Sequence, residues 1–360
     1  TSKAIAEAIE GVGGVMNAST DKEVTLYWAR VPADRLELAV DVLCDVVSDS
    51  RLVAEDVERE RMVILEELKM YLDQPQDYVH SLFEQVMWPG HSLGRDIIGT
   101  VASVSQTSRD ELRAYVEGRY RLPRLVAGVA GGIDAGTSRE LVESRLELPD
   151  GAGEVREEVA PDPLTSPTVL VHRKDTEQAH ICLGTRGVSY LDEDRYALDV
   201  LNAALGEGMS SRLFLEIRER RGLAYDVHSF TSKHRDAGYF AVYLGVDPNK
   251  AQEAAEAVVG ELRALQADLL PPEELAKAKE FMKGRIRLGL EGTNSLASWL
   301  CQQRLLMDRN LTVDEVVALI DAVTAEDVRR VARRVLGAPL QLATIGPFDS
   351  DAGFRSAIGA

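Results

Sequence analysis

The sequence predicts a fold of mixed helices and strands, built from two similar halves. Its 360 residues are enough for two domains of common size. Both the 3.6-residue periodicity of amphipathic helices and the alternation typical of strands occur along the chain. In addition, residues 24–43 can be laid over residues 239–259, because both stretches read as strand, polar turn and helix. These observations indicate a duplicated unit that contains helices and strands.

The elements of the first half follow in a clear order. Side chains alternate over 24–31, which predicts a strand, and helical periodicity follows over 33–47 and again over 54–72. The second half repeats this order from residue 239, and its second helix begins at Pro272. Residues 149–163 are rich in Gly, Pro and acidic residues, as linkers are. We therefore predict an N-terminal domain over 1–148, a linker over 149–163 and a C-terminal domain over 164–360.

The composition excludes several classes of partner. Asp and Glu number 59 against 41 Lys and Arg, and the resulting charge of −18 opposes binding to nucleic acid or anionic lipid. No apolar run is long enough to span a membrane. Cys44, Cys182 and Cys301 are odd in number and form no CxxC pair, so we interpret them as reduced core residues. Reduced cysteines favour a cytoplasmic protein.

The predicted helix over 54–72 carries Glu60 and Glu67, two turns apart on one face. Under the overlay of the two halves, Ala278 and Arg285 take their places, so the shared fold does not require the two acids. One interpretation is a solvated stripe beside neighbouring basic residues. The other is a metal site, because a carboxylate can complete a zinc site begun by two imidazoles.

The histidines do not supply the rest of such a site. No two of the six are spaced i, i+4, and the chain contains neither HExxH nor HxxEH. Each isolated histidine is more often a packed or surface residue than a metal ligand. The sequence by itself therefore holds no complete metal site.

Several segments together resemble the pitrilysin and insulinase family of zinc metallopeptidases, most closely its bacterial and mitochondrial-processing-peptidase branch. Their order and spacing carry the resemblance, which covers nearly the whole chain. It implies an α+β fold with two homologous domains, each a mostly antiparallel β-sheet covered by helices. The segments are GGVMNAST from Gly13, ERERMVILEEL from Glu58, PGHSLGRDIIGT from Pro89, EQAHICLG from Glu177 and GMSSRLFLEIRERRGLAY from Gly208.

In that family, an HxxEH helix supplies two histidine ligands and a general-base glutamate, and a distal glutamate in an ERxxVxxE-like context supplies the third zinc ligand. The matching context here is 60–67, so the resemblance implies that Glu67 binds the metal and that Glu60 supports it. Family spacing would place HxxEH about ten residues before Thr1. We therefore expect a truncated chain that binds no zinc by itself. The rival explanation is a natural partner subunit that has lost the motif.

The resemblance also implies residues that handle the substrate. The strand edge around Asn17 and Ala18 can accept an extended peptide, or can be an ordinary hairpin. The resemblance favours substrate docking there. Arg218 and Tyr225 resemble the family's pair that hydrogen-bonds the scissile carbonyl and stabilises the oxyanion. The alternative is that Arg218 makes a surface ion pair with Glu216 or Glu219 and that Tyr225 lies in the core.

The expected function is that of a zinc-dependent metalloendopeptidase that hydrolyses unfolded peptides, as a homodimer or as a heterodimer with a related subunit. The chain as it stands is expected to be inactive. The first alternative is a non-catalytic, peptide-binding partner subunit of a heterodimeric peptidase. The second is an unrelated α+β binding protein, which would place Arg218 and Tyr225 far from any cavity shared with Glu67.

Overall fold

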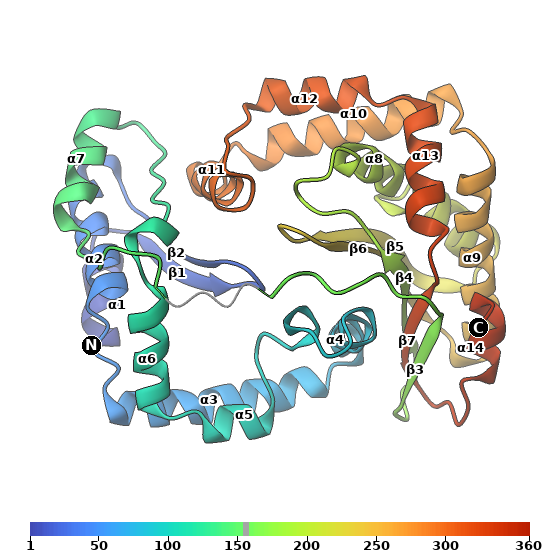
Figure 1. The fold of residues 1–360 in the computed structure, drawn as a ribbon, viewed down its shortest axis with the longest axis horizontal. Helices are drawn as coiled ribbons and strands as arrows, with labels where there is room; N and C mark the ends of the chain where they lie inside the picture. Colours follow the sequence, from blue (N-terminus) through green and yellow to red (C-terminus); the bar gives the residue numbers. More distant parts are fainter. Residues whose placement is uncertain (154–157) are drawn as a thin grey trace. The chain divides into compact units, whose positions relative to one another are not determined.

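The computed structural model describes residues 1–153 and 158–360 (Figure 1). The chain divides into two compact units, each of which includes a helix from the other half of the sequence. Unit 1 spans Thr1–Leu68, Ile97–Glu157 and Leu288–Asn310, and unit 2 spans Lys69–Asp96, Glu158–Arg287 and Leu311–Ala360. The division into domains at 149–163 stays a prediction, and residues 154–157 of that linker lie outside the described residues.

Unit 1 contains a two-stranded antiparallel sheet in which Val15 lies opposite Arg30 and Thr20 opposite Thr25. Gly13 makes the turn into this hairpin with φ of 75°, a conformation that favours glycine. The elements are α1 (Ser2–Glu10), β1 (Val15–Thr20), β2 (Thr25–Arg30), η1 (Ala33–Arg35), α2 (Leu36–Ser48), α3 (Ala54–Leu72, whose last turn belongs to unit 2), α5 (Val101–Gln106), α6 (Arg109–Arg119), η3 (Leu122–Arg124), α7 (Ala135–Arg145) and α11 (Thr293–Met307).

Unit 2 contains a sheet of five strands within the described ranges, in the order β3-β7-β4-β6-β5. Only the β3–β7 pair among these is parallel, so the sheet is mostly antiparallel. The elements are α4 (Pro75–Met87), η2 (Ser92–Gly94), β3 (Thr168–Arg173), β4 (Ala179–Arg186), α8 (Arg195–Gly206), the π-helical η4 (Phe214–Arg220), β5 (Ala224–Lys233), β6 (Gly238–Val246), η5 (Pro248–Lys250), α9 (Ala251–Ala267), α10 (Pro272–Gly289), α12 (Val313–Ala322), α13 (Ala325–Leu336), β7 (Gln341–Gly346) and α14 (Ala352–Ile358).

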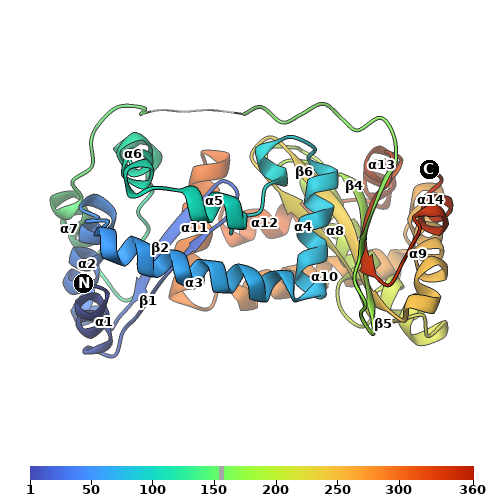
Figure 2. The same cartoon turned by 90° about the horizontal axis from the view of Figure 1, so that it is seen from below.

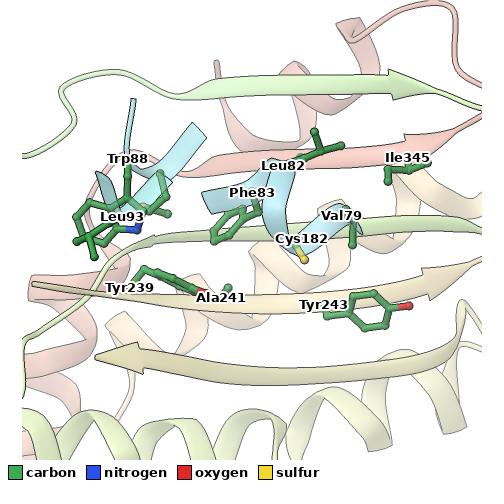
Figure 3. Packing of buried hydrophobic residues seen from close by; sticks show 12 residues of the cluster. Val79, Leu82, Phe83, Trp88, Leu93, Cys182, Tyr239, Ala241, Tyr243 and Ile345 are labelled. Carbon is green, nitrogen blue, oxygen red and sulfur yellow. The ribbon is translucent and has the colours of Figure 1, made fainter. Parts of the chain in front are cut away.

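Helices cover the unit 2 sheet, with α4 packed across β3, β7 and β4, while α8, α9 and α13 contact β4, β5 and β6 (Figures 1 and 2). Along β6 every residue is buried, because both faces of the strand are covered. The α4 side of the sheet forms one apolar cluster, in which Val79 and Phe83 are fully buried (Figure 3). Burial of one such side chain stabilises the folded protein by about 1.5–3 kcal/mol.

The predicted elements agree with the observed ones. The helix predicted over 54–72 is α3, the one over 33–47 is η1 followed by α2, and the strand over 24–31 is β2. The repeat also appears in the structure, because the overlay pairs the first residue of α2 with that of α9 and the first residue of α3 with that of α10. The α+β class with mostly antiparallel strands is therefore confirmed.

The cysteines and the hydropathy also agree with the sequence predictions. Cys44, Cys182 and Cys301 are free and buried. Among the described residues, no helix combines the length and the apolar character needed to cross a bilayer.

Candidate functional site

Glu60 and Glu67 lie on α3 with exposed side chains. Their basic neighbours are engaged elsewhere: Arg59 pairs with Asp56 at 2.9 Å, and Arg61 pairs with Glu58 at 2.9 Å. In the described part of the chain, neither Glu60 nor Glu67 has a hydrogen bond or ion pair. The oxygen atoms of both carboxylates are therefore available to bind a ligand.

The second repeat uses the corresponding positions for packing and pairing. Ala278 on α10 is 2% exposed. Arg285, the counterpart of Glu67 in the second repeat, pairs with Glu207 at 2.7 Å. The acids of the first repeat thus have no structural task like that of their counterparts. This difference between the repeats argues against a fold requirement for Glu60 and Glu67.

Arg61 fixes the segment of α3 that carries these acids. Its guanidinium donates to the carbonyl oxygen of Thr107 at 2.7 Å and also to that of Val104. These carbonyls lie at the end of α5, where backbone acceptors have no partner within the helix. The interactions join α3 to the α5–α6 connection within unit 1.

The described residues do not fit a complete zinc site. Across 1–153 and 158–360, no group of three or more His, Cys, Asp or Glu side chains is arranged to hold a metal ion. Glu67 offers one carboxylate, whereas a catalytic zinc site uses three protein ligands. No catalytic step through a metal can therefore be derived from these residues alone.

Asn17 and Ala18 lie on β1, which pairs with β2 on one edge only within the described residues. Both side chains are exposed. The amide of Ala18 donates to the Asn17 side-chain oxygen at 2.8 Å. The outer edge of β1 can accept an extended peptide by strand addition. A peptide that used the Ala18 amide would have to replace this local hydrogen bond.

Arg218 and Tyr225 lie together in unit 2. The Arg218 guanidinium is 5.3 Å from the centroid of the Tyr225 ring and 4.8 Å from that of Phe214, which is cation–π geometry. Tyr225 is 72% exposed, so it is not a core residue. Arg218 lies on η4, a π-helical turn of the kind frequent at functional sites.

The surface-pair alternative for Arg218 is weak. Glu216 is occupied by Arg220 at 2.9 Å and by Arg221 at 2.7 Å. The Nε atom of Arg218 reaches Glu219 only at 4.0 Å, the outer limit for an ion pair. Both the guanidinium and the phenol thus keep donors for another group. Arg218 and Tyr225 belong to unit 2, whereas the candidate residues on β1 and α3 belong to unit 1.

Sequence reasoning missed a cluster of three histidines around Tyr243 in unit 2. The Tyr243 hydroxyl is 2.8 Å from Nδ1 of His180, and the rings of His80 and His228 lie 5.4 and 5.1 Å from the Tyr243 ring. Nδ1 of His80 is 3.6 Å from Sγ of Cys182. The strand register brings them together, because Tyr243 lies opposite both Cys182 and His228. The sequence signal that could have revealed this cluster is the alternation of side chains along β4 and β5, which puts every second residue on the same face of the sheet.

Burial lowers the pKa of two histidines of this cluster, His80 and His180. It lowers the pKa of His80, and the nearby His228 lowers that pKa further. Burial also lowers the pKa of His180. The lowered pKa values favour the neutral imidazoles of His80 and His180.

Comparison with known proteins identifies the family. Residues 1–101 match the family model described as insulinase, peptidase family M16, and residues 106–282 match the model described as peptidase M16 inactive domain. The chain belongs to peptidase family M16. An uncharacterized zinc protease of Streptomyces coelicolor is 40% identical over 95% of this chain and 76% of its own length. The uncharacterized zinc protease YmxG of Bacillus subtilis is 37% identical over 96% of this chain and 84% of its own length.

Solved structures show the same fold. A protease from Helicobacter pylori superposes with a TM-score of 0.84 at 20% identity, covering 95% of this chain and 84% of that one. A peptidase M16 inactive domain from Pseudomonas fluorescens superposes with a TM-score of 0.84 at 19% identity, covering 97% and 84%. The predicted M16 membership, which rested on five short segments, is confirmed.

Proposed function

We propose that this chain is the peptide-handling body of a zinc metalloendopeptidase that hydrolyses unfolded peptides. The difference between the repeats carries the proposal: two exposed, unpaired carboxylates on α3 stand where the second repeat has a buried alanine and a paired arginine. In the complete enzyme, Glu67 supplies one zinc ligand and Glu60 supports it. The two imidazole ligands and the general base come from outside the described residues.

Each remaining candidate has a role that its chemistry allows. The outer edge of β1 binds the peptide as an added strand, and Asn17 and Ala18 form part of that edge. Arg218 and Tyr225 donate hydrogen bonds to the scissile carbonyl and to the oxyanion that develops on it. Zinc, when bound, lowers the pKa of a water molecule so that it can act as the nucleophile. Dimerisation, with an identical or related subunit, would bring further peptide-binding surface.

The experiment compares Glu67→Gln with Glu66→Gln in the natural full-length protein. Glu66 is the matched control, because it lies one position away on the same helix and has no proposed role. We expect Glu67→Gln to lose both zinc, measured by atomic emission, and cleavage of a quenched fluorescent peptide. Glu66→Gln should retain both. A Glu67→Gln protein with full zinc content and full cleavage would refute the assignment of Glu67 as ligand.

A second candidate function is a non-catalytic, peptide-binding partner subunit. The match of residues 106–282 to the M16 inactive-domain model favours it. Such a subunit would bind unfolded peptides with no zinc. The zinc content of the natural full-length protein therefore separates the two functions: one equivalent per chain supports the peptidase, and none supports the partner subunit.

A further inference from the structure

One face of α10 follows the loop 207–212, which leads into the π-helical turn η4. Residues spaced three or four apart lie on one side of a helix, and four such positions of α10 lie against the loop in reverse order. They are Glu274, Lys277, Phe281 and Arg285. The proposed function uses Arg218 on η4 and Tyr225 on β5, and it gives no task to α10.

The contact near the start of α10 is a bidentate ion pair. Nε of Arg212 donates to Oε1 of Glu274 at 2.6 Å, and Nη2 donates to Oε2 at 2.8 Å. The two side chains are 22% and 17% exposed, so solvent screens their attraction only in part. Two parallel hydrogen bonds fix the direction of the guanidinium as well as its distance. Arg212 lies two residues before η4 begins, so the ion pair holds the backbone that enters η4.

The middle of the loop lies against the next turns of α10. The Lys277 ammonium donates to the carbonyl oxygen of Ser210 at 2.6 Å. Gly208 has a φ of 80°, a conformation that favours glycine. A Cβ atom there would lie 3.5 Å from the Phe281 ring, so the ring lies beside the backbone at this position. A charge and a ring from the same helix face therefore hold the middle of the loop.

The start of the loop is held from two sides. One carboxylate oxygen of Glu207 accepts from the Arg285 guanidinium at 2.7 Å, and the other accepts from the side-chain amide of Asn202 at 2.6 Å. Asn202 lies on α8 and is 3% exposed. Glu207 thus joins α8, the loop and α10. With contacts at both ends and in the middle, the loop keeps a fixed position relative to α10.

The loop is continuous with the helical segment that carries Arg218. The backbone amide of Leu215 donates to the carbonyl oxygen of Ser211 at 3.1 Å, a helical hydrogen bond across the start of η4. Ile217 is fully buried and holds η4 against the core of unit 2. The next residue is Arg218, whose guanidinium lies over the Tyr225 ring. A shift of the loop would rotate η4 about the buried Ile217 and change the direction of the Arg218 side chain.

We propose that Glu274 and Arg285 on α10 are positioning residues for Arg218. Through the loop 207–212, they fix the direction in which the Arg218 guanidinium leaves η4 and meets Tyr225. The inference rests on the proposed function, which assigns the two donors to the scissile carbonyl. Donors to an oxyanion act by being in place before the reaction, and a misplacement of about 1 Å can lower the rate about 100-fold.

A purely structural role of these contacts makes a different prediction. Their loss would then lower the free energy of unfolding, as loss of any half-buried ion pair does. The geometry of Arg218 and Tyr225 in the molecules that remain folded would not change. A measurement on the pair itself therefore separates a positioning role from a structural one.

Fluorine NMR of the natural full-length protein, labelled with 3-fluorotyrosine, measures this geometry. The resonance that is missing from Tyr225→Phe belongs to Tyr225. Arg218→Gln sets the reference shift, because it removes the cation from the ring face. We expect Glu274→Gln to move the Tyr225 resonance by at least half of this reference shift. Arg285→Gln should move it in the same direction, and since Arg285 is 65% exposed, this variant serves as the test if Glu274→Gln does not fold.

Asp321→Asn is the matched control. It breaks another ion pair of α10, which Lys283 makes with Asp321 on α12 at 2.7 Å, and neither residue contacts the loop. The Tyr225 resonance should keep its position in this variant. A Tyr225 resonance that stays at the wild-type position in both Glu274→Gln and Arg285→Gln would overturn the proposal. A shift of equal size in Asp321→Asn would also overturn it.

Peptide-cleavage kinetics give the second readout. We expect Glu274→Gln to lower kcat by about 10-fold or more, with KM and zinc content unchanged, because the misplaced donors act on the oxyanion and not on the bound peptide. A normal kcat in Glu274→Gln, in a protein whose kcat does fall in Tyr225→Phe, would overturn the positioning role. A normal kcat in Tyr225→Phe refutes the proposed function instead, and the fluorine shift still decides whether α10 orients the pair.

Discussion

The guanidinium of Arg218 lies 5.3 Å from the centre of the Tyr225 ring, and both side chains keep unused hydrogen-bond donors. The contact orients a cation and a phenol side by side on an exposed surface of unit 2. The π-helical turn that carries Arg218 and the start of β5 that carries Tyr225 are joined through Gly222, at φ of 59°. This arrangement suits two donors that act on one oxygen atom.

If this pair stabilises an oxyanion, removing one donor should slow catalysis. We expect Tyr225→Phe in the natural full-length protein to lower kcat by about 100-fold or more, with unchanged zinc content. Arg220→Lys is the control, because Arg220 pairs with Glu216 and should tolerate the exchange. Peptide-cleavage kinetics measure the effect, and a Tyr225→Phe protein with normal kcat would contradict the assigned role.

The histidine cluster predicts a loss of stability in mild acid. Burial holds the pKa of His80 and that of His180 below the ordinary value, so the folded protein binds these protons less readily than the unfolded chain does. The stabilisation is complete above the unfolded pKa of about 6.5 and is lost as the pH falls below it toward the folded values. The nearby carboxylate of Asp77 raises the pKa of both histidines and so reduces this effect in part.

Urea denaturation between pH 7.5 and 5.0 measures this loss. We expect the free energy of unfolding of the wild type to fall as the pH is lowered. It should fall less in His80→Gln, which removes one titrating group. His172→Gln is the comparison, because His172 packs on Tyr78 outside the cluster. Identical pH dependence in the wild type and in His80→Gln would show that His80 does not contribute.

Two glycines should respond in opposite ways to alanine. A Cβ atom on Gly184 would lie 2.0 Å from the carbonyl oxygen of Phe240 in the neighbouring strand, so the strands would have to move apart. We expect Gly184→Ala to destabilise the protein by about 1–3 kcal/mol. Gly260 lies in α9 with open space around it, and Gly260→Ala should stabilise by about 0.5–1 kcal/mol. Thermal melting of both variants checks the signs.

The core beneath α4 predicts a large cost for one truncation. Phe83 is fully buried against the sheet, so Phe83→Ala should lower the free energy of unfolding by about 3–5 kcal/mol. Met209 is 76% exposed, and Met209→Ala should change it by less than about 0.5 kcal/mol. Urea denaturation compares the two. If Phe83→Ala lowers the free energy of unfolding no more than Met209→Ala does, α4 does not pack on the sheet in the way described.

Local pattern was enough to predict the repeat and several elements, and the family resemblance implied the α+β class. Periodicity predicted α3 over its full length, because helical amphipathicity is written within the segment itself. The overlay of the halves singled out Glu60 and Glu67, because the second half has no acidic residue at the corresponding positions. The spacing of Arg218 and Tyr225, together with the family resemblance, predicted a pair that does lie together. Each of these inferences uses residues that are close in the sequence or repeated along it.

Only the tertiary structure decided which distant segments meet. Helix α4 packs on the sheet of unit 2, and α11 on that of unit 1, so each repeat contributes a helix to the other unit. His80 on α4 meets Tyr243 on β6 because α4 packs across the sheet. Such contacts depend on the favourable burial of apolar surface between remote segments. That free energy depends on the final arrangement and has no signature in the local pattern.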